Sequence, residues 1–304
     1  MNTIPRKLIA ILFTGHVGSS WLLSLIDNHP RIRQLGFEPV DDLTEIDVEA
    51  TPYFERVIHG ERLDSLPERI AVILGKKFED IESSVPNSLD GQSLGDFDYI
   101  AFKARVTLQI QRPFFEQWLP AERPTMILLR RRNKIKNAVS QFKRTQLNIS
   151  HLRNFDQTVL KRRPIIVDPR YILDQATQFT LRELRTTRYF KRVCATFDIR
   201  GFEISYEELL SQTSRDAFLK SFYRSIGLQN SASASSRYCK ITSDSLPTAV
   251  ENYQQLADRI SGTIFEPCLT NDRYDVVQEI LAGDVEFPSL TDDRMLELID
   301  TLFG

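Results

Sequence analysis

The stretch LIAILFTGHVGSSWLLSL, which runs from Leu8 to Leu25, consists of an apolar run, a glycine turn and a second apolar run. The first run has the length and composition of a strand that is buried on both faces of a parallel sheet. In the second run, Trp21, Leu22, Leu25 and Ile26 recur with helical spacing. The stretch therefore predicts a buried strand, a tight turn and a helix, which is the arrangement of a phosphate-binding loop.

The composition of the chain is that of an ordinary globular protein. Its 304 residues are 41% hydrophobic and 26% charged, and the formal net charge is -2. With so little net charge, nucleic acid is not an expected partner. A membrane is not expected either, because no run of about 18 apolar residues is present. Three cysteines without metal-ligand spacing (Cys194, Cys239 and Cys268) favour reduced thiols in a cytoplasmic protein, and nothing indicates an oligomeric state.

Strands and helices alternate along the rest of the chain. Apolar runs predict strands at Gln34–Phe37, Asp98–Phe102, Thr125–Leu129 and Phe202–Ser205. Helical patterns start near Asn133, cover Asp174–Phe197, follow the last strand through Ile226, and recur at Leu246–Ile260 and Asp275–Ala282. This alternation predicts one domain over residues 1–304, a three-layer α/β/α fold with a mainly parallel central sheet. Within it we expect a helical insertion at 45–95, a mobile loop at 229–237 and a C-terminal helical extension at 261–304.

Polar residues follow the predicted strands one after another. They are the glycine turn Gly15–Ser20, Glu38, Lys103 with Arg105, Arg130 to Arg132, and Tyr206 with Glu207. The carboxyl ends of parallel strands lie at one edge of a sheet, and ligands bind there. We therefore expect all five segments to contribute to one site.

The glycine turn has the features of an anion site. Gly15 and Gly18 allow a positive φ, the following helix presents N–H donors, and Ser19 and Ser20 add hydroxyls. A nucleoside triphosphatase loop would end in Gly-Lys-Ser/Thr, where the lysine meets the phosphates and the hydroxyl meets magnesium. The sequence Gly18-Ser19-Ser20 therefore argues against a metal–triphosphate substrate. A tight turn without a ligand is the alternative.

A basic run, RRRNKIKNAVSQFKR, carries seven basic residues and no acid between Arg130 and Arg144. We expect Lys134, Lys136 and Lys143 to lie on a solvated helix face. Arg132 and Ser140 are placed to meet on one anion, because one lies at the helix start and the other about two turns along it. Two phosphate sites on one sheet edge indicate a nucleotide with phosphates at both ends.

The stretches FTGHVGSSWLLSLIDNHP and ILLRRRNKIKNAVSQF resemble the two cofactor motifs of the sulfotransferases that use 3′-phosphoadenosine 5′-phosphosulfate (PAPS). The resemblance implies a P-loop NTPase-like sulfotransferase fold, PAPS as donor, adenosine 3′,5′-bisphosphate as product, and no required metal. FEISYEELLS and RYCKITSDSLPTAVENYQQL resemble two further segments of the family. The implied cofactor-binding residues are Gly15, His16, Val17, Gly18, Ser19, Ser20, Trp21, Arg132, Ser140, Tyr206 and Lys240.

The resemblance also implies a general base and a charge for the leaving group of an in-line transfer. Glu38, in GFEPV, resembles the base of carbohydrate and tyrosyl-protein sulfotransferases, and His29 is a competing base. His16 stands where the family usually has lysine or arginine. Either protonated His16 stabilises the leaving group, or it shapes the loop while Lys103 or Arg105 supplies the charge.

The acceptor is expected to be a small metabolite or a sugar, which receives the sulfuryl group on a hydroxyl or an amine. Arg105, at the carboxyl edge of the predicted sheet, is expected to contact this acceptor. The acidic stretch that includes Asp41 and Asp42 would attract a cationic acceptor, although such stretches are commonly solvated surface. Two alternatives stay open, namely a P-loop kinase of small molecules and a sulfonucleotide-binding protein that has lost catalysis.

Overall fold

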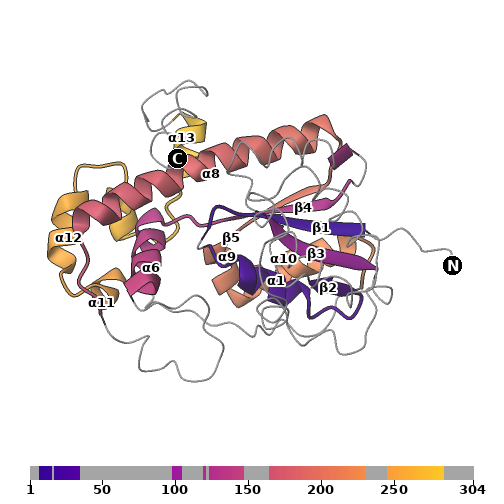
Figure 1. The fold of residues 1–304 in the computed structure, drawn as a ribbon, viewed down its shortest axis with the longest axis horizontal. Coiled ribbons are helices and arrows are strands. Elements are labelled where there is room, and N and C mark those ends of the chain that lie inside the picture. Colours follow the sequence, from indigo (N-terminus) through magenta and orange to yellow (C-terminus); the bar gives the residue numbers. More distant parts are fainter. Residues whose placement is uncertain are drawn as a thin grey trace, which may run out of the picture.

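The computed structural model describes residues 7–15, 17–34, 98–104, 119–120, 123–146, 164–229 and 245–283. Its centre is a five-stranded sheet in the order β2-β3-β1-β4-β5 (Figure 1). The strands are β1 (Lys7–Leu12), β2 (Ile32–Gln34), β3 (Tyr99–Ala104), β4 (Thr125–Arg130) and β5 (Gly201–Ser205). All four pairings are parallel, which confirms the predicted α/β class and parallel sheet.

The strand β1 occupies the middle of the sheet because it is apolar throughout its length. Leu8 to Leu12 are at most 1% exposed, as expected for a strand that is covered on both faces. Leu12 is in register with Ala104 of β3 and with Leu128 of β4. The segment after β1 therefore lies between the segments that follow its two neighbours.

Helices cover both faces of the sheet, which gives three layers (Figure 1). The helices are α1 (Ser19–Ile26), α6 (Lys134–Gln146), α8 (Pro169–Thr196), α9 (Tyr206–Leu210), α10 (Gln212–Ser225), α11 (Leu246–Ala249), α12 (Tyr253–Ile260) and α13 (Val276–Ala282), with a 3-10 helix η5 at Glu266–Leu269. None of the described helices is both long enough and apolar enough to cross a membrane.

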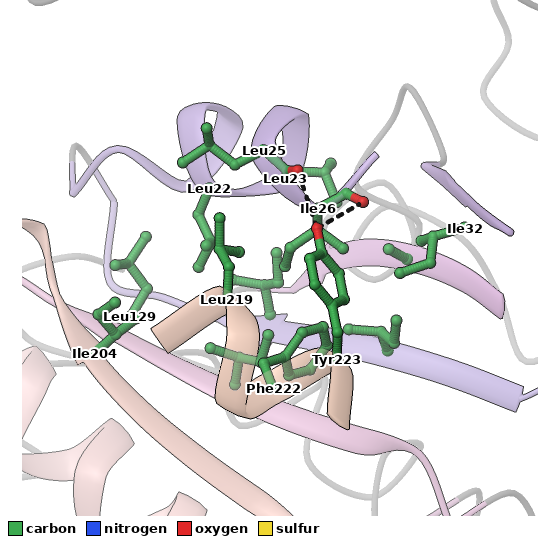
Figure 2. Packing of buried hydrophobic residues seen from close by; sticks show 14 of the residues in the cluster. Leu22, Leu23, Leu25, Ile26, Ile32, Leu129, Ile204, Leu219, Phe222 and Tyr223 are labelled. Carbon is green, nitrogen blue, oxygen red and sulfur yellow. Dashed lines mark hydrogen bonds between the residues drawn. The ribbon is translucent and has the colours of Figure 1, made fainter. Parts of the chain in front are cut away.

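The helices α1 and α10 lie on the same face of the sheet (Figure 2). Leu22 and Leu25 of α1 belong to one buried cluster with Phe222 and Tyr223 of α10. The Tyr223 hydroxyl donates to the Leu25 carbonyl at 3.3 Å, and burial raises the pKa of this phenol. This packing fixes the axis of α1, and with it the place where that helix begins.

The opposite face is covered by the second half of α8, and the first half of α8 extends beyond the sheet. There it packs with α6 and with the helices between 246 and 283, around Ile135, Phe179, Leu256 and Phe265 (Figure 1). The helix α6, which carries the predicted phosphate-binding arginine at its start, is thus supported by a helical cluster as well as by the sheet.

The predicted helix Leu246–Ile260 is wrong in one respect, because the chain forms two helices there. Val250 is extended, with φ -122° and ψ 120°, and forms a parallel bridge with Ile165. The Asn252 side chain accepts from the Val167 N–H at 2.9 Å and donates to its carbonyl at 2.8 Å. These contacts with a segment far away in sequence interrupt the helical pattern.

The predicted second strand is displaced. The strand β2 starts at Ile32 rather than at Gln34, and Ile32 is in register with Tyr99. The expected insertion at 45–95 lies outside the described residues, as do residues 230–237 of the expected loop and 284–304 of the expected extension.

Candidate functional site

Four chain segments meet at the carboxyl edge of the sheet. Leu12 of β1 is beside Leu128 of β4, and Arg130 of β4 is beside Ser205 of β5. The turn after β1, the end of β3, the loop after β4 and the start of α9 therefore approach one another, as the strand pattern predicts.

The glycine turn has the conformation that its sequence predicts. Gly15 and Gly18 have φ values of 89° and 83°, in the left-handed region that glycine adopts without strain. Gly18 is the N-cap residue of α1 and provides no side-chain cap. Among the described residues, no side chain accepts from the first-turn N–H groups of α1. These donors and the positive end of the helix dipole form an anion-binding position.

Tyr206 closes one side of this turn. A Cβ atom on Gly18 would lie 2.7 Å from Cδ2 of Tyr206, so only glycine fits against the ring. Trp21 meets the same ring edge-on, with the centroids 5.7 Å apart. Burial raises the pKa of the Tyr206 phenol. Tyr206, which the sequence resemblance predicts to be a cofactor-binding residue, is thus packed directly against the glycine turn.

Lys103 brings a positive charge to the first turn of α1. Its side chain is 8% exposed, and its Nζ donates to Oγ of Ser20 at 3.1 Å. The same ammonium lies 5.7 Å from the centroid of the Phe13 ring. A lysine from β3 therefore stands beside the glycine turn, although the turn itself carries no lysine.

Thr14 is a further polar residue of the turn, and sequence reasoning missed it. It is 3% exposed, and its hydroxyl has no hydrogen-bond partner among the described residues. A buried hydroxyl without a partner is unfavourable unless a ligand or water completes it. The position of Thr14, directly before Gly15, is the sequence feature that could have identified it as a site residue.

The start of α6 is organised differently, because protein side chains occupy its N–H groups. The Glu207 carboxylate accepts from the backbone N–H groups of Arg132 at 3.0 Å and of Asn133 at 3.3 Å. The Asn133 side chain accepts from the N–H of Lys136 at 2.9 Å, as an N-cap residue does. The backbone at this helix start is already satisfied.

The Arg132 guanidinium lies beside Glu208, with its Nη2 donating to Oε1 at 2.7 Å. The Arg132 side chain is 24% exposed, so it is within reach of a ligand in solution. Ser140 is half-buried and lies eight residues further along α6. The structure therefore keeps Arg132 accessible at the edge where the sequence places it.

The neighbouring arginines have structural contacts instead. Arg130 pairs with Asp275 at 2.9 Å on the α8 side of the sheet, and Glu183 and Glu203 lie close to it. Burial opposes the charge of Arg130, but the three carboxylates outweigh this and raise its pKa. The Arg131 guanidinium lies 4.8 Å from the centroid of the Tyr206 ring.

The expectation that Lys134 and Lys143 belong to a solvated helix face is wrong. Lys134 is 0% exposed; its Nζ pairs with Glu183 at 2.8 Å and donates to the Arg131 carbonyl. Lys143 is 1% exposed, and burial lowers its pKa. Lys136 is partly exposed and pairs with Asp272 at 2.6 Å. The cause for Lys134 is a carboxylate from α8, which the local sequence does not reveal.

His29 is occupied by internal hydrogen bonds and does not suit the role of a competing base. Its Nε2 lies 3.0 Å from the Gln229 carbonyl, and its Nδ1 accepts from the Arg31 N–H at 3.2 Å. The ring also packs against Tyr223. The histidine therefore supports the end of α1.

Several predicted site residues lie outside the described residues. They are His16, Glu38, Asp41, Asp42, Arg105 and Lys240. In the described part of the chain, no group of three or more His, Cys, Asp or Glu residues has the arrangement of a metal site. Burial raises the pKa values of Cys194 and Cys268 to about 11, so neither is a reactive thiol.

Comparison with solved structures finds sulfotransferases. The sulfotransferase domain from the curacin biosynthetic pathway has a TM-score of 0.42 and 12% identity, with 98% of this chain and 97% of that chain covered. A sulfotransferase from Alicyclobacillus acidocaldarius has a TM-score of 0.42 and 12% identity over 92% and 97% of the two chains. One from Mycobacterium tuberculosis has a TM-score of 0.38 and 11% identity over 86% and 78%. No family model and no curated protein matches the chain.

Proposed function

We propose that the chain is a sulfotransferase that moves the sulfuryl group of PAPS to a hydroxyl or amine of a small metabolite or a sugar. The contacts of Tyr206 carry the proposal, because this one ring lies against Gly18 and beneath the Arg131 guanidinium. The two loops that the sequence assigns to the 5′ and 3′ ends of a nucleotide therefore adjoin the same side chain.

The glycine turn suits the 5′ end of such a nucleotide. It offers the first-turn N–H groups of α1, the Ser20 hydroxyl with the Lys103 ammonium beside it, and the Thr14 hydroxyl that lacks a partner. Backbone N–H groups and one ammonium suit a phosphosulfate, which is anionic but needs no metal bridge. The missing Gly-Lys-Ser/Thr sequence disfavours a kinase that uses a metal–triphosphate.

The loop after β4 suits the 3′-phosphate. Arg132 is the arginine of this loop that keeps an accessible guanidinium, whereas Arg130 is paired with Asp275. Ser140 supplies a hydroxyl from α6, the helix that follows this loop. A charge-assisted bond to a phosphate is worth about 1.5–3 kcal/mol.

PAPS supplies a transferable sulfuryl group, and the chain supplies orientation and charge. Lys103 donates to Ser20 in the first turn of α1, so we assign it the stabilisation of the leaving phosphate, a task that His16 would share if protonated. Glu38 is proposed as the base that takes the acceptor proton. Arg105, Asp41 and Asp42 are proposed to contact the acceptor, and Lys240 the nucleotide.

The test is nucleotide binding measured by calorimetry, followed by turnover of labelled PAPS with a panel of acceptors. We expect Arg132→Ala to weaken binding of adenosine 3′,5′-bisphosphate by about 10- to 100-fold, while AMP binding stays unchanged. Lys136→Ala removes the same charge from the first turn of α6 and should change either affinity less than about threefold. An equal loss in both variants would contradict a specific 3′-phosphate contact. Binding of ATP without binding of the bisphosphate would favour the kinase.

A further inference from the structure

Glu208 contacts two elements with its two carboxylate oxygens. Its Oε2 accepts from the backbone N–H and the hydroxyl of Ser205, both at 2.8 Å, and the Glu208 N–H donates back to the Ser205 hydroxyl at 3.2 Å. This is a capping box, which fixes the carboxylate at the start of α9. Its Oε1 is thereby directed to Arg132 and accepts a hydrogen bond from Nη2 of that residue at 2.7 Å.

Arg132 keeps most of its donors for a ligand. A guanidinium has five N–H donors on three nitrogens, and Glu208 accepts from Nη2 alone. No other partner of this guanidinium is found in the described parts of the chain. The backbone at this position cannot add donors, because Glu207 accepts from the N–H groups of Arg132 and Asn133.

We propose that Glu208 is a positioning residue that holds the Arg132 guanidinium ready for the 3′-phosphate, an inference that rests on the proposed function. An arginine side chain loses conformational entropy when it is held in one place. Because Glu208 already holds Arg132 in the free protein, this loss does not reduce the affinity for the ligand. The capping box supplies the rigidity, since the carboxylate is already bound through its other oxygen.

A competing role makes the opposite prediction. If Glu208 only occupied the place of a ligand anion, its removal would strengthen phosphate binding, because a carboxylate repels a phosphate. Positioning predicts that removal weakens the binding of ligands with a 3′-phosphate and of no others. The sign of the effect therefore separates the two roles.

The experiment compares adenosine 3′,5′-bisphosphate with AMP by calorimetry and takes the ratio of their affinities as the 3′-phosphate preference. We expect Glu208→Ala to lower this preference about fivefold to tenfold in the wild-type background, and less than about twofold in the Arg132→Ala background. Ser205→Ala leaves both charges in place and loosens the anchor of Glu208. Ser205→Ala should lower the 3′-phosphate preference about twofold to threefold. If Glu208→Ala does not fold, Ser205→Ala tests the proposal in its place.

The outcomes are distinguishable. If Arg132→Ala itself leaves the preference unchanged, the proposed 3′-phosphate site fails, and the role of Glu208 fails with it. If Arg132→Ala lowers the preference but Glu208→Ala keeps or raises it, the positioning role alone is overturned. An equal loss of affinity for both nucleotides in Glu208→Ala also overturns it, because that pattern indicates general support of the fold.

Discussion

The helices α1 and α6 start at the same edge of the sheet but are prepared for ligands in opposite ways. The helix α1 follows left-handed glycines, has no side-chain cap at Gly18, and has Lys103 beside its first turn. At α6, Asn133 and the Glu207 carboxylate already accept from the N–H groups of the helix start. Backbone donors are thus available at the first position, whereas at the second a ligand depends on side chains.

The difference indicates why the two positions would recognise different parts of one molecule. Backbone N–H groups at a glycine turn donate to any phosphate oxygen that comes close enough. A single held guanidinium, as proposed for Arg132, would discriminate between a nucleotide with and without a second phosphate. We therefore expect the α1 start to supply common affinity and the α6 start to supply specificity.

The largest effect is expected where buried charge supports the α6 start. Glu183 is 1% exposed and pairs with Lys134, and its Oε2 also accepts from the Arg131 N–H at 3.3 Å. Glu183→Ala leaves buried cations without their carboxylate and should cost about 3–5 kcal/mol in the free energy of unfolding, measured with urea. Glu203→Ala, at the exposed rim of the same cluster, should cost less than about 1 kcal/mol. Equal losses would mean that the buried cluster does not support α6.

The glycine turn should show the next largest effect, and its two glycines form a matched pair. Both have positive φ, so Gly15→Ala should cost about 1–2 kcal/mol in unfolding free energy from backbone strain alone. Gly18→Ala adds a clash with the Tyr206 ring, at 2.7 Å, and should cost about 1–3 kcal/mol more. No atom lies within 4 Å of a Cβ on Gly15. If both variants lose equal stability, Tyr206 does not close the turn.

The parts of this comparison that depend on local pattern could be predicted from the sequence. The apolar run of β1, the glycine turn and the helical spacing of α1 depend on neighbouring residues, and the structure confirms all three. The carboxyl-edge placement of Lys103 and Arg132 follows from strand order, and both lie there.

The parts that depend on distant partners could not be predicted. The local sequence predicts that Lys134 is a solvated cation, but its ion pair with Glu183 of α8 makes its burial favourable. Arg130 equally gives no local sign that Asp275, 145 residues away, pairs with it. The break at Val250 is caused by a bridge to Ile165. In each case a tertiary contact decides between two structures that the local sequence allows.

A medium effect is expected at Lys103, which tests whether the α1 start supplies common affinity. Lys103→Met keeps the length of the side chain and removes the ammonium that contacts Ser20. We expect AMP and adenosine 3′,5′-bisphosphate to lose affinity by the same factor, about tenfold in calorimetry. Lys7→Met, at the opposite end of β1, removes an equal charge and should change neither. A loss of affinity confined to the bisphosphate would mean that Lys103 contacts the 3′-phosphate instead of the 5′-phosphate.

The smallest effect is a pH dependence of stability from Glu208. Burial opposes ionisation of this carboxyl, but the hydrogen bonds from Ser205 and the charges of Arg132 and Arg130 outweigh burial and lower its pKa. A carboxyl whose pKa is lower in the folded state stabilises the fold above its unfolded pKa of about 4.3, and this contribution is lost as the pH falls through the folded value. The difference in unfolding free energy between the wild type and Glu208→Gln should therefore be constant near neutral pH and shrink below about pH 4. Glu251→Gln, which replaces an exposed carboxyl, is the control and should show no such change. A difference that stays constant down to pH 3 would mean that the pKa of Glu208 is the same in the folded and the unfolded chain, so that neither Ser205 nor the charge of Arg132 stabilises its carboxylate.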